Sequence, residues 1–414
     1  MLLSSIRQAL AALLVAFLVS ACGGSGGAAP PPTGGVTVTP GDGAVTVTWN
    51  AQPGVKYWIF YAPLSGNFSS ITTDNWTQIP GSVAVLNVTS PYVVTGLSNG
   101  FTYAFTVNGR TGDGPGGPGT PSVSSVPRPA GASWQTLANV GSNTLRGITY
   151  GTSSADLLGY YLTVGDSGAA YRSVDGVTWS GLDVSGGATL NAATYTFGNF
   201  IAAGPGGLLR YSTDMGTWTT AASNTTQNLN AIASNGALAI AVGDNGTIIE
   251  SANGSAWVTV TNLPTTKHLY GIAYSASGVW TAVGAGGTVL VSADGGTWSL
   301  ATSGTTATLR AVAVQTVVTS MILATGDNGT AIASADNGAT WTTRTTGTTA
   351  NLLTANANTS QFLATGQGGV VITSTDSVTW TTRSSSTVAD LYAAISGLAQ
   401  YLVVGQGGTE IRSQ

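Results

Sequence analysis

Short segments in which hydrophobic and polar residues alternate begin at Val36 and recur along the rest of the chain. Examples are residues 36–40 (VTVTP), 44–49 (AVTVTW) and 55–61 (VKYWIFY), which are bounded by Gly, Pro, Asn or Asp. A two-residue period places alternate side chains on opposite faces of a strand, and the bounding residues favour turns. The pattern predicts an all-β protein.

From residue 133 a longer pattern repeats at intervals of about 40 residues. Each unit contains a leucine that starts an apolar segment, a Gly-x-x-Gly turn and a tryptophan. The leucines are Leu145, Leu190, Leu229, Leu269, Leu309, Leu352 and Leu391, and the tryptophans are Trp134, Trp179, Trp218, Trp257, Trp298, Trp341 and Trp380. We expect four strands per unit, the innermost starting at the leucine and the outermost carrying the tryptophan. Such units are typical of β-propeller blades.

The two ends of the repeat predict how the propeller closes. The chain ends just after Ser413, before another tryptophan would be due, whereas Trp134 stands alone at the start of the repeat. We therefore expect residues 132–137 (ASWQTL) to supply the outer strand of the last unit. Seven blades would then close into a ring that leaves no sheet edge free.

In the first part of the chain, Trp49 lies on an early strand, Tyr57, Ile59 and Tyr61 occupy alternate positions, and Tyr103 follows a turn as in a tyrosine corner. With these features, residues 36–127 resemble a fibronectin type III domain. The resemblance implies a two-sheet sandwich that serves as a spacer or a binding module. Residues 128–132 contain a proline and a glycine that interrupt strands, so they predict a linker to a propeller at 133–414.

The connection before each tryptophan in the later units has a recurring sequence, such as SVDGVTW (173–179) and SADNGATW (334–341). It resembles the Asp-box of sialidase-like and photosystem II assembly-factor propellers, and this resemblance covers residues 133–414. A short acidic side chain can accept backbone N–H groups in a tight turn, so the repeated acids are expected to be structural. They are Asp175, Asp214, Asp294, Asp336 and Asp376.

The beginning of the chain predicts export and an anchor. Arg7 precedes an apolar segment, Ala9–Val19, that is too short to span a bilayer, so residues 1–21 are interpreted as a signal peptide. The following Val19-Ser20-Ala21-Cys22 resembles a bacterial lipobox, which implies lipidation at Cys22. Residues 22–35 are rich in Gly and Pro and predict a tether. Together these features predict a cell-envelope lipoprotein, in the outer membrane and either periplasmic or surface-exposed.

Composition excludes several classes of site. Of 414 residues, 16 are acidic and 12 are Lys or Arg, so the net charge is −4 and the broad basic surface for nucleic-acid binding is missing. A single cysteine excludes an intrachain disulfide framework, and a single histidine, His268, excludes a multi-histidine metal centre. We therefore expect no cofactor and no resident metal.

Candidate binding residues follow the leucines, where the residue type varies while its neighbours repeat. This position holds Arg146, Asn191, Asn230, Tyr270, Arg310, Leu353 and Tyr392. Forked donors and aromatic faces at one mouth of a ring suit a protein or carbohydrate partner, which favours a binding or assembly scaffold.

The alternative is a sialidase-like glycoside hydrolase. That resemblance implies an arginine triad, a Tyr/Glu nucleophile pair and an acid/base aspartate, yet the chain contains only two glutamates, Glu250 and Glu410. Asp183 and Asp390 are the remaining candidates for a catalytic carboxylate pair, because both precede an innermost strand and would face the same mouth. His268 with Lys267 is a further candidate base.

Overall fold

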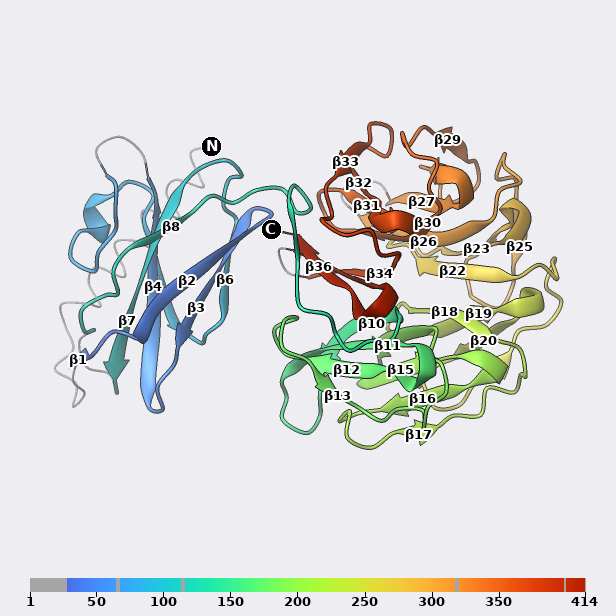
Figure 1. The fold of residues 1–414 in the computed structure, drawn as a ribbon, viewed down its shortest axis with the longest axis horizontal. Helices are drawn as coiled ribbons and strands as arrows, with labels where there is room; N and C mark the ends of the chain where they lie inside the picture. The colour runs from blue at the N-terminus through green and yellow to red at the C-terminus, as the bar shows by residue number, and fades with distance from the viewer. Residues whose placement is uncertain (1–27, 65–67, 113–115, 317–319, 398–399, 414) are drawn as a thin grey trace. The chain divides into compact units, whose positions relative to one another are not determined.

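The computed structural model describes residues 28–64, 68–112, 116–316, 320–397 and 400–413 (Figure 1). Strands and 3-10 helices make up its regular structure, and these residues contain no α-helix. They divide into two compact units, one that ends at Ala130 and one that spans Gly131–Ser413. Within the described part of the chain, no helix has the length and apolar character needed to span a membrane. Cys22 and the predicted signal peptide lie outside the described residues.

The first unit contains two antiparallel sheets. One sheet comprises β1 (Ala28–Ala29), β4 (Val55–Pro63), β5 (Val83–Val88), β7 (Tyr103–Thr111) and β8 (Val123–Ser125). The other comprises β2 (Thr33–Gly41), β3 (Ala44–Asn50) and β6 (Tyr92–Thr95). A 3-10 helix, η1 (Trp76–Gln78), lies between β4 and β5.

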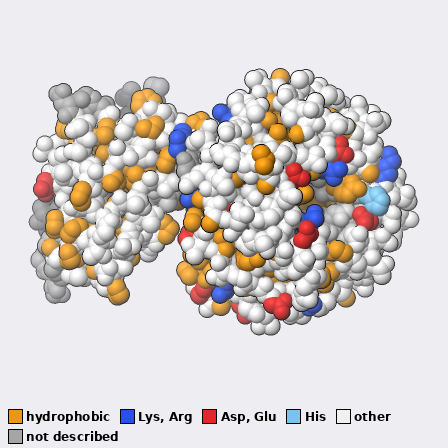
Figure 2. All heavy atoms as spheres, viewed as in Figure 1, with side chains coloured by type: hydrophobic (Ala, Val, Ile, Leu, Met, Phe, Trp, Pro, Cys, Tyr) orange, Lys and Arg blue, Asp and Glu red, His pale blue; other side chains and the backbone are white. Residues whose placement is uncertain are grey.

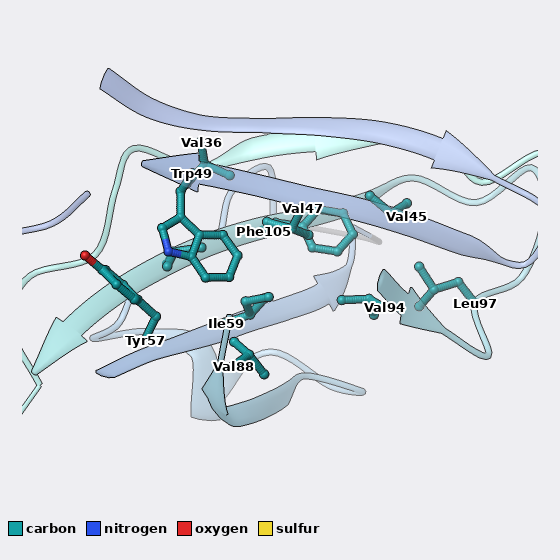
Figure 3. Packing of buried hydrophobic residues seen from close by; sticks show 11 residues of the cluster. Val36, Val45, Val47, Trp49, Tyr57, Ile59, Val88, Val94, Leu97 and Phe105 are labelled. Carbon is teal, nitrogen blue, oxygen red and sulfur yellow. The ribbon is translucent and has the colours of Figure 1, made fainter. Parts of the chain in front are cut away.

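The core of this unit lies between the two sheets. Figure 3 shows Val47 and Trp49 of β3 facing Ile59 of β4 and Phe105 of β7, and all four side chains are buried. Alternate residues of each strand point inward, as the two-residue period predicts. At the start of β7, the Tyr103 hydroxyl accepts a hydrogen bond from the Ser98 backbone N–H at 3.2 Å.

One part of the first unit differs from the sequence predictions, and another was not covered by them. Residues 28–35 are not only a tether, because β1 pairs with β7 and β2 already begins at Thr33. The segment between β4 and β5 forms a second core, in which Ile71 and Ile79 pack on Phe60. Phe60 alternates with the inward-facing Ile59, so this second core covers the opposite face of the sheet.

The second unit, in its described residues, consists of seven four-stranded antiparallel sheets. The first four are β10 (Leu145–Thr152), β11 (Gly159–Gly165), β12 (Ala170–Ser173), β13 (Ser180–Gly181); β14 (Ala192–Thr196), β15 (Asn199–Ala203), β16 (Leu209–Ser212), β17 (Thr219–Thr220); β18 (Leu229–Ser234), β19 (Ala239–Gly243), β20 (Ile248–Ser251), β21 (Val258–Thr259); and β22 (Leu269–Tyr274), β23 (Trp280–Gly284), β24 (Val289–Ser292), β25 (Ser299–Ala301).

The remaining three sheets continue this order. They are β26 (Leu309–Thr316), β27 (Ser320–Gly326), β28 (Ala331–Ser334), β29 (Thr342–Arg344); β30 (Leu352–Ala357), β31 (Phe362–Gly366), β32 (Val371–Ser374), β33 (Thr381–Arg383); and β34 (Leu391–Ser396), β35 (Tyr401–Gly405), β36 (Glu410–Ser413), β9 (Trp134–Thr136). Between the second and third strands lie η2 (Asp166–Gly168), η3 (Pro205–Gly207), η4 (Asp244–Gly246), η5 (Ala285–Gly287), η6 (Asp327–Gly329), η7 (Gln367–Gly369) and η8 (Gln406–Gly408).

The last sheet joins the two ends of the second unit. β36 pairs antiparallel with β9, so that Ile411 lies opposite Thr136 and Ser413 opposite Trp134. This pairing is the one predicted for residues 132–137. In addition, β34 of the last sheet lies against β10 of the first, so the sheets at the two ends of the array are neighbours.

The connections that carry the recurring sequence before each tryptophan form tight turns. In the first of them, the Asp175 carboxylate accepts hydrogen bonds from the backbone N–H groups of Val177 and Thr178, both at 2.8 Å. Asp214, Asp294, Asp336 and Asp376 accept equivalent bonds in their own connections.

The tryptophans occupy a slightly different place from the predicted one. Six of the outer strands start one residue after the tryptophan, and β9 alone among the described strands of this kind starts on it. The indole N–H of six of the seven tryptophans donates to the backbone carbonyl three residues earlier, as Trp298 does to Gly295 at 2.6 Å. Trp179 donates instead to the side chain of Glu410.

Candidate functional site

The candidate binding residues lie on one side of the second unit, which we call the turn face. It consists of the first residues of the innermost strands and the 3-10 turns η2 to η8. Backbone hydrogen bonds join the turns to the residue just before the innermost strand, such as the one that the Asp244 N–H donates to the Asn228 carbonyl at 2.9 Å. Turns η3 to η7 also lie against the innermost strand of the next sheet, and η8 lies against β10 of the first.

Two of the turns, η4 and η6, contain an Asn-Gly pair, which favours a type I′ turn. In η4, Asn245 has a φ of 54° and Gly246 a φ of 73°, as both central residues of a type I′ turn require. A Cβ atom on Gly246 would lie 2.3 Å from the Thr265 carbonyl oxygen. Glycine is therefore needed both for the backbone conformation and for the close approach of the neighbouring connection.

Arg146 forms a three-residue cluster with an acid of its own sheet and an aromatic residue of the adjacent sheet. Its Nε and Nη2 donate to the two carboxylate oxygens of Asp166, at 2.5 and 3.0 Å. The guanidinium carbon lies 5.3 Å from the centre of the Tyr392 ring. The hydrogen bond to Asp166 raises the pKa of Arg146, so the group is a permanent cation.

Arg310 repeats this arrangement in another pair of sheets. It donates through Nε and Nη2 to both carboxylate oxygens of Asp327, the second bond being 3.2 Å long, and its guanidinium carbon lies 5.9 Å from the Tyr270 ring centre. The arginine side chains are 37% and 35% exposed in the two clusters. In each cluster the aspartate accepts hydrogen bonds from two of the five N–H donors of the guanidinium. The guanidinium is therefore held in place and keeps donors for a ligand.

Asp244 occupies the same turn position as Asp166 and Asp327, but its partners differ. Asn230 and His268 donate to its Oδ1, each at 3.0 Å, and Asn228 donates to its Oδ2 at 2.8 Å. Partial burial would raise the pKa of Asp244, but these hydrogen bonds outweigh that effect and leave the pKa lowered. The carboxylate is therefore ionised over the physiological pH range.

His268 is part of this turn-face cluster rather than an isolated loop residue. Its ring stacks on Tyr270 with the ring centres 6.3 Å apart and 20° between the planes. Figure 2 shows acidic and basic side chains around the middle of one face of this unit, with the histidine beside an acidic side chain.

Two of the predicted binding residues join neighbouring sheets. Asn191 donates its side-chain N–H to the carbonyl of Leu229 at 3.0 Å, and Asn230 donates to the carbonyl of Leu269 at 2.9 Å. Both amides therefore hold the start of the next innermost strand. Arg146, Arg310, Tyr270 and Tyr392 are the predicted residues that the structure brings together in pairs.

The two candidate catalytic acids each serve a turn. Asp183 accepts the Gly186 backbone N–H at 2.9 Å, within the connection from β13 to β14. Asp390 accepts the Gly368 N–H of η7 at 2.9 Å, as Asn228 accepts that of Gly206 in η3 at 3.0 Å. Asp390 thus occupies a position where an amide performs the same function, which is typical of a structural cap.

The acids of the turns are the site residues that the sequence analysis did not assign. Asp166 and Asp327 each follow the first glycine of a turn in a unit whose innermost strand has arginine after its leucine. The joint occurrence of this aspartate and this arginine in the first and fifth sheets is the sequence feature that indicates the pairs. Among the described residues, no group of three or more His, Cys, Asp or Glu is placed to hold a metal ion.

Comparison with known proteins supports the architecture of the second unit. No protein-family model matches the chain, and neither does any curated protein sequence. Among solved structures, YCF48 from Cyanidioschyzon merolae is similar, with 17% identity, a TM-score of 0.54, and coverage of 68% of this chain and 99% of that chain. A structure described as YCF48 bound to D1 peptide has 16% identity, a TM-score of 0.55, and coverage of 69% and 97%.

The WD40 β-propeller domain of Doa1 is also similar, with 12% identity, a TM-score of 0.55, and coverage of 68% of this chain and 97% of that chain. At these identities the likeness concerns the fold alone. Together with the four-stranded sheets, it confirms the predicted β-propeller.

Proposed function

We propose that this protein is a binding or assembly scaffold of the cell envelope, in which a seven-bladed propeller captures a protein partner at its turn face. In this proposal each four-stranded sheet is one blade, and β9 completes the seventh. The first unit, which we interpret as a fibronectin type III domain, serves as a spacer. A lipid on Cys22 anchors the chain to the outer membrane.

The observation that carries the proposal is the pair of arginine clusters. Arg146 and Arg310 are each fixed by two hydrogen bonds to an aspartate and lie beside a tyrosine of the adjacent sheet. Donors that are already oriented lose little freedom on binding, so they favour recognition of a partner. The structure of YCF48 bound to D1 peptide shows that a propeller of similar fold in another protein engages a peptide.

A glycan is the other partner that polar and aromatic residues at the turn face would suit, and hydrolysis of such a glycan is the enzymatic alternative. We do not favour hydrolysis, because Asp183 and Asp390 accept backbone N–H groups of separate turns. A general acid and base must instead face one substrate.

The test is substitution of both arginines. We expect Arg146→Ala with Arg310→Ala to reduce capture of envelope proteins by about tenfold or more, since two oriented cations are lost. Capture is measured by cross-linking and quantitative mass spectrometry. Arg344→Ala, on the outer strand β29, is the matched control and should retain wild-type capture. Equal capture by all three proteins would contradict a binding role for the turn face, and capture of glycans alone would exclude a protein partner.

A further inference from the structure

Comparison of equivalent positions in three sheets singles out Asp244. The first, third and fifth sheets each carry an aspartate at the same place in the turn, namely Asp166, Asp244 and Asp327. In the first and fifth sheets, the residue after the leucine is an arginine that pairs with this acid through two hydrogen bonds. In the third sheet the same position holds Asn230. Asp244 therefore lacks the guanidinium that neutralises its two counterparts.

The groups around Asp244 donate three hydrogen bonds to its carboxylate without supplying a permanent charge. Asn228 and Asn230 donate amide N–H groups, and His268 donates through Nδ1. Lys267 is the adjacent cation in the sequence, but its ammonium donates to the Gly286 carbonyl of the next turn at 3.4 Å. A carboxylate has about four acceptor positions, and these three donors leave one on Oδ2.

The surroundings of Asp244 remain open enough for a partner. Its side chain is 23% exposed and that of His268 is 46% exposed. The ring of Tyr270 lies beside Arg310 and stacks on the ring of His268. The net charge of −4 also favours the approach of a positively charged partner.

We infer that Asp244 binds a guanidinium from the protein partner through the acceptor position left on Oδ2, which supplies the positive charge that Arg146 and Arg310 supply to their own aspartates within the chain. This inference rests on the proposed function and names the chemistry of the partner, an arginine side chain in an exposed segment. Asn228 and Asn230 orient the carboxylate, and His268 with Tyr270 forms the flat surface next to the incoming group. The aspartates of the first and fifth sheets stay paired with their own arginines.

The inference is tested with blocked octapeptides of Ala, Gly and Ser that contain one central Arg, citrulline, Lys or Glu. Binding to the full chain is measured by fluorescence anisotropy at pH 8, above the ordinary titration range of imidazole. We expect the Arg peptide to bind at least tenfold more tightly than the citrulline and Glu peptides. Asp244→Asn should remove this preference.

Asn230→Arg provides the second variant, because it recreates within the third sheet the pair found in the first and fifth. It should also abolish the preference for the Arg peptide, while the thermal midpoint stays within a few degrees of wild type. Asp183→Asn, on the same face, is the control and should bind the Arg peptide as wild type does.

The outcomes separate this inference from the proposed function. Equal binding of the Arg and citrulline peptides, tighter binding of the Lys or Glu peptide, or a preference that survives Asp244→Asn would overturn the inference while the turn face remained a protein-binding surface. Absence of binding by every peptide would also overturn it. The proposed function would be rejected only if, in addition, partner capture were unchanged in the Arg146 and Arg310 double variant.

Discussion

At the scale of single residues, Glu410 is an exception within its repeat. It is the first residue of β36, and the first residues of β12, β16, β20, β24, β28 and β32 are all apolar. Its side chain is fully buried, and Oε2 accepts the Trp179 indole N–H at 2.9 Å, whereas Oε1 has no hydrogen-bond partner among the described residues. Burial raises the pKa of Glu410 to about 8, against smaller opposing effects of Trp179 and Arg412.

Glu410 should make stability depend on pH. The folded protein keeps a proton with a pKa of about 8, whereas the unfolded chain releases it near 4.5. This contribution is therefore fully present below pH 4.5 and is lost as the pH rises towards 8, by at most about 1.4 kcal/mol per pH unit. We expect Glu410→Gln to flatten the decline of the urea midpoint between pH 5 and 9, followed by tryptophan fluorescence.

Glu250→Gln is the comparison for this prediction. Glu250 lies on β20 and is less buried than Glu410, and burial also raises its pKa. Its substitution should change the pH dependence less. If the urea midpoint declined equally with pH in wild type and Glu410→Gln, the buried carboxyl group would not be the cause of the pH dependence.

At the scale of elements, repetition made most of the second unit predictable. The leucine opens the innermost strand in six sheets, and the exception is β14, which begins at Ala192 instead of Leu190. The pairing of residues 132–137 with β36 followed from counting tryptophans. The second core around Phe60 could not be predicted, because residues between β4 and β5 lack a strand period and occur once.

The candidate site was predictable in part for the same reason. Alignment of the repeats placed Arg146 and Tyr392 at equivalent positions, but their contact depends on the order of sheets around the ring. The contact of Arg146 with Asp166 joins residues 20 apart across a hairpin. Whether two such residues form a contact depends on the direction of their side chains at the ends of the strands. The spacing of residues in the sequence does not give this direction.

The pairing of β9 with β36 leads to a prediction about fragments. A fragment of residues 131–414 should unfold cooperatively, because it retains every strand of the second unit. A fragment that starts at residue 138 lacks β9, so β36 becomes an exposed edge. We expect it to aggregate or to lose at least several degrees of thermal stability, measured by circular dichroism and size-exclusion chromatography. Equal stability of the two fragments would mean that β9 does not close the unit.

At the scale of the whole molecule, the proposed anchor determines where the turn face acts. If Cys22 carries the lipid, Cys22→Ser should move the protein from the membrane fraction to the soluble envelope fraction, because each buried methylene of an acyl chain contributes about 0.8 kcal/mol. Fractionation with labelling by a palmitate analogue measures this change. Ser25→Ala, in the same segment, is the control, and retention of Cys22→Ser in membranes would contradict the anchor.

The sheet that combines β9 with β36 has a consequence for how this chain can be rearranged. β9 is the first strand of the second unit and β36 is the last, and the two are hydrogen-bonded neighbours. A short linker between Ser413 and Gly131 would therefore leave the sheets undisturbed, and new termini placed in any outer connection would yield a circular permutant. The order of the strands along the chain can thus be changed without changing the order of the sheets in space.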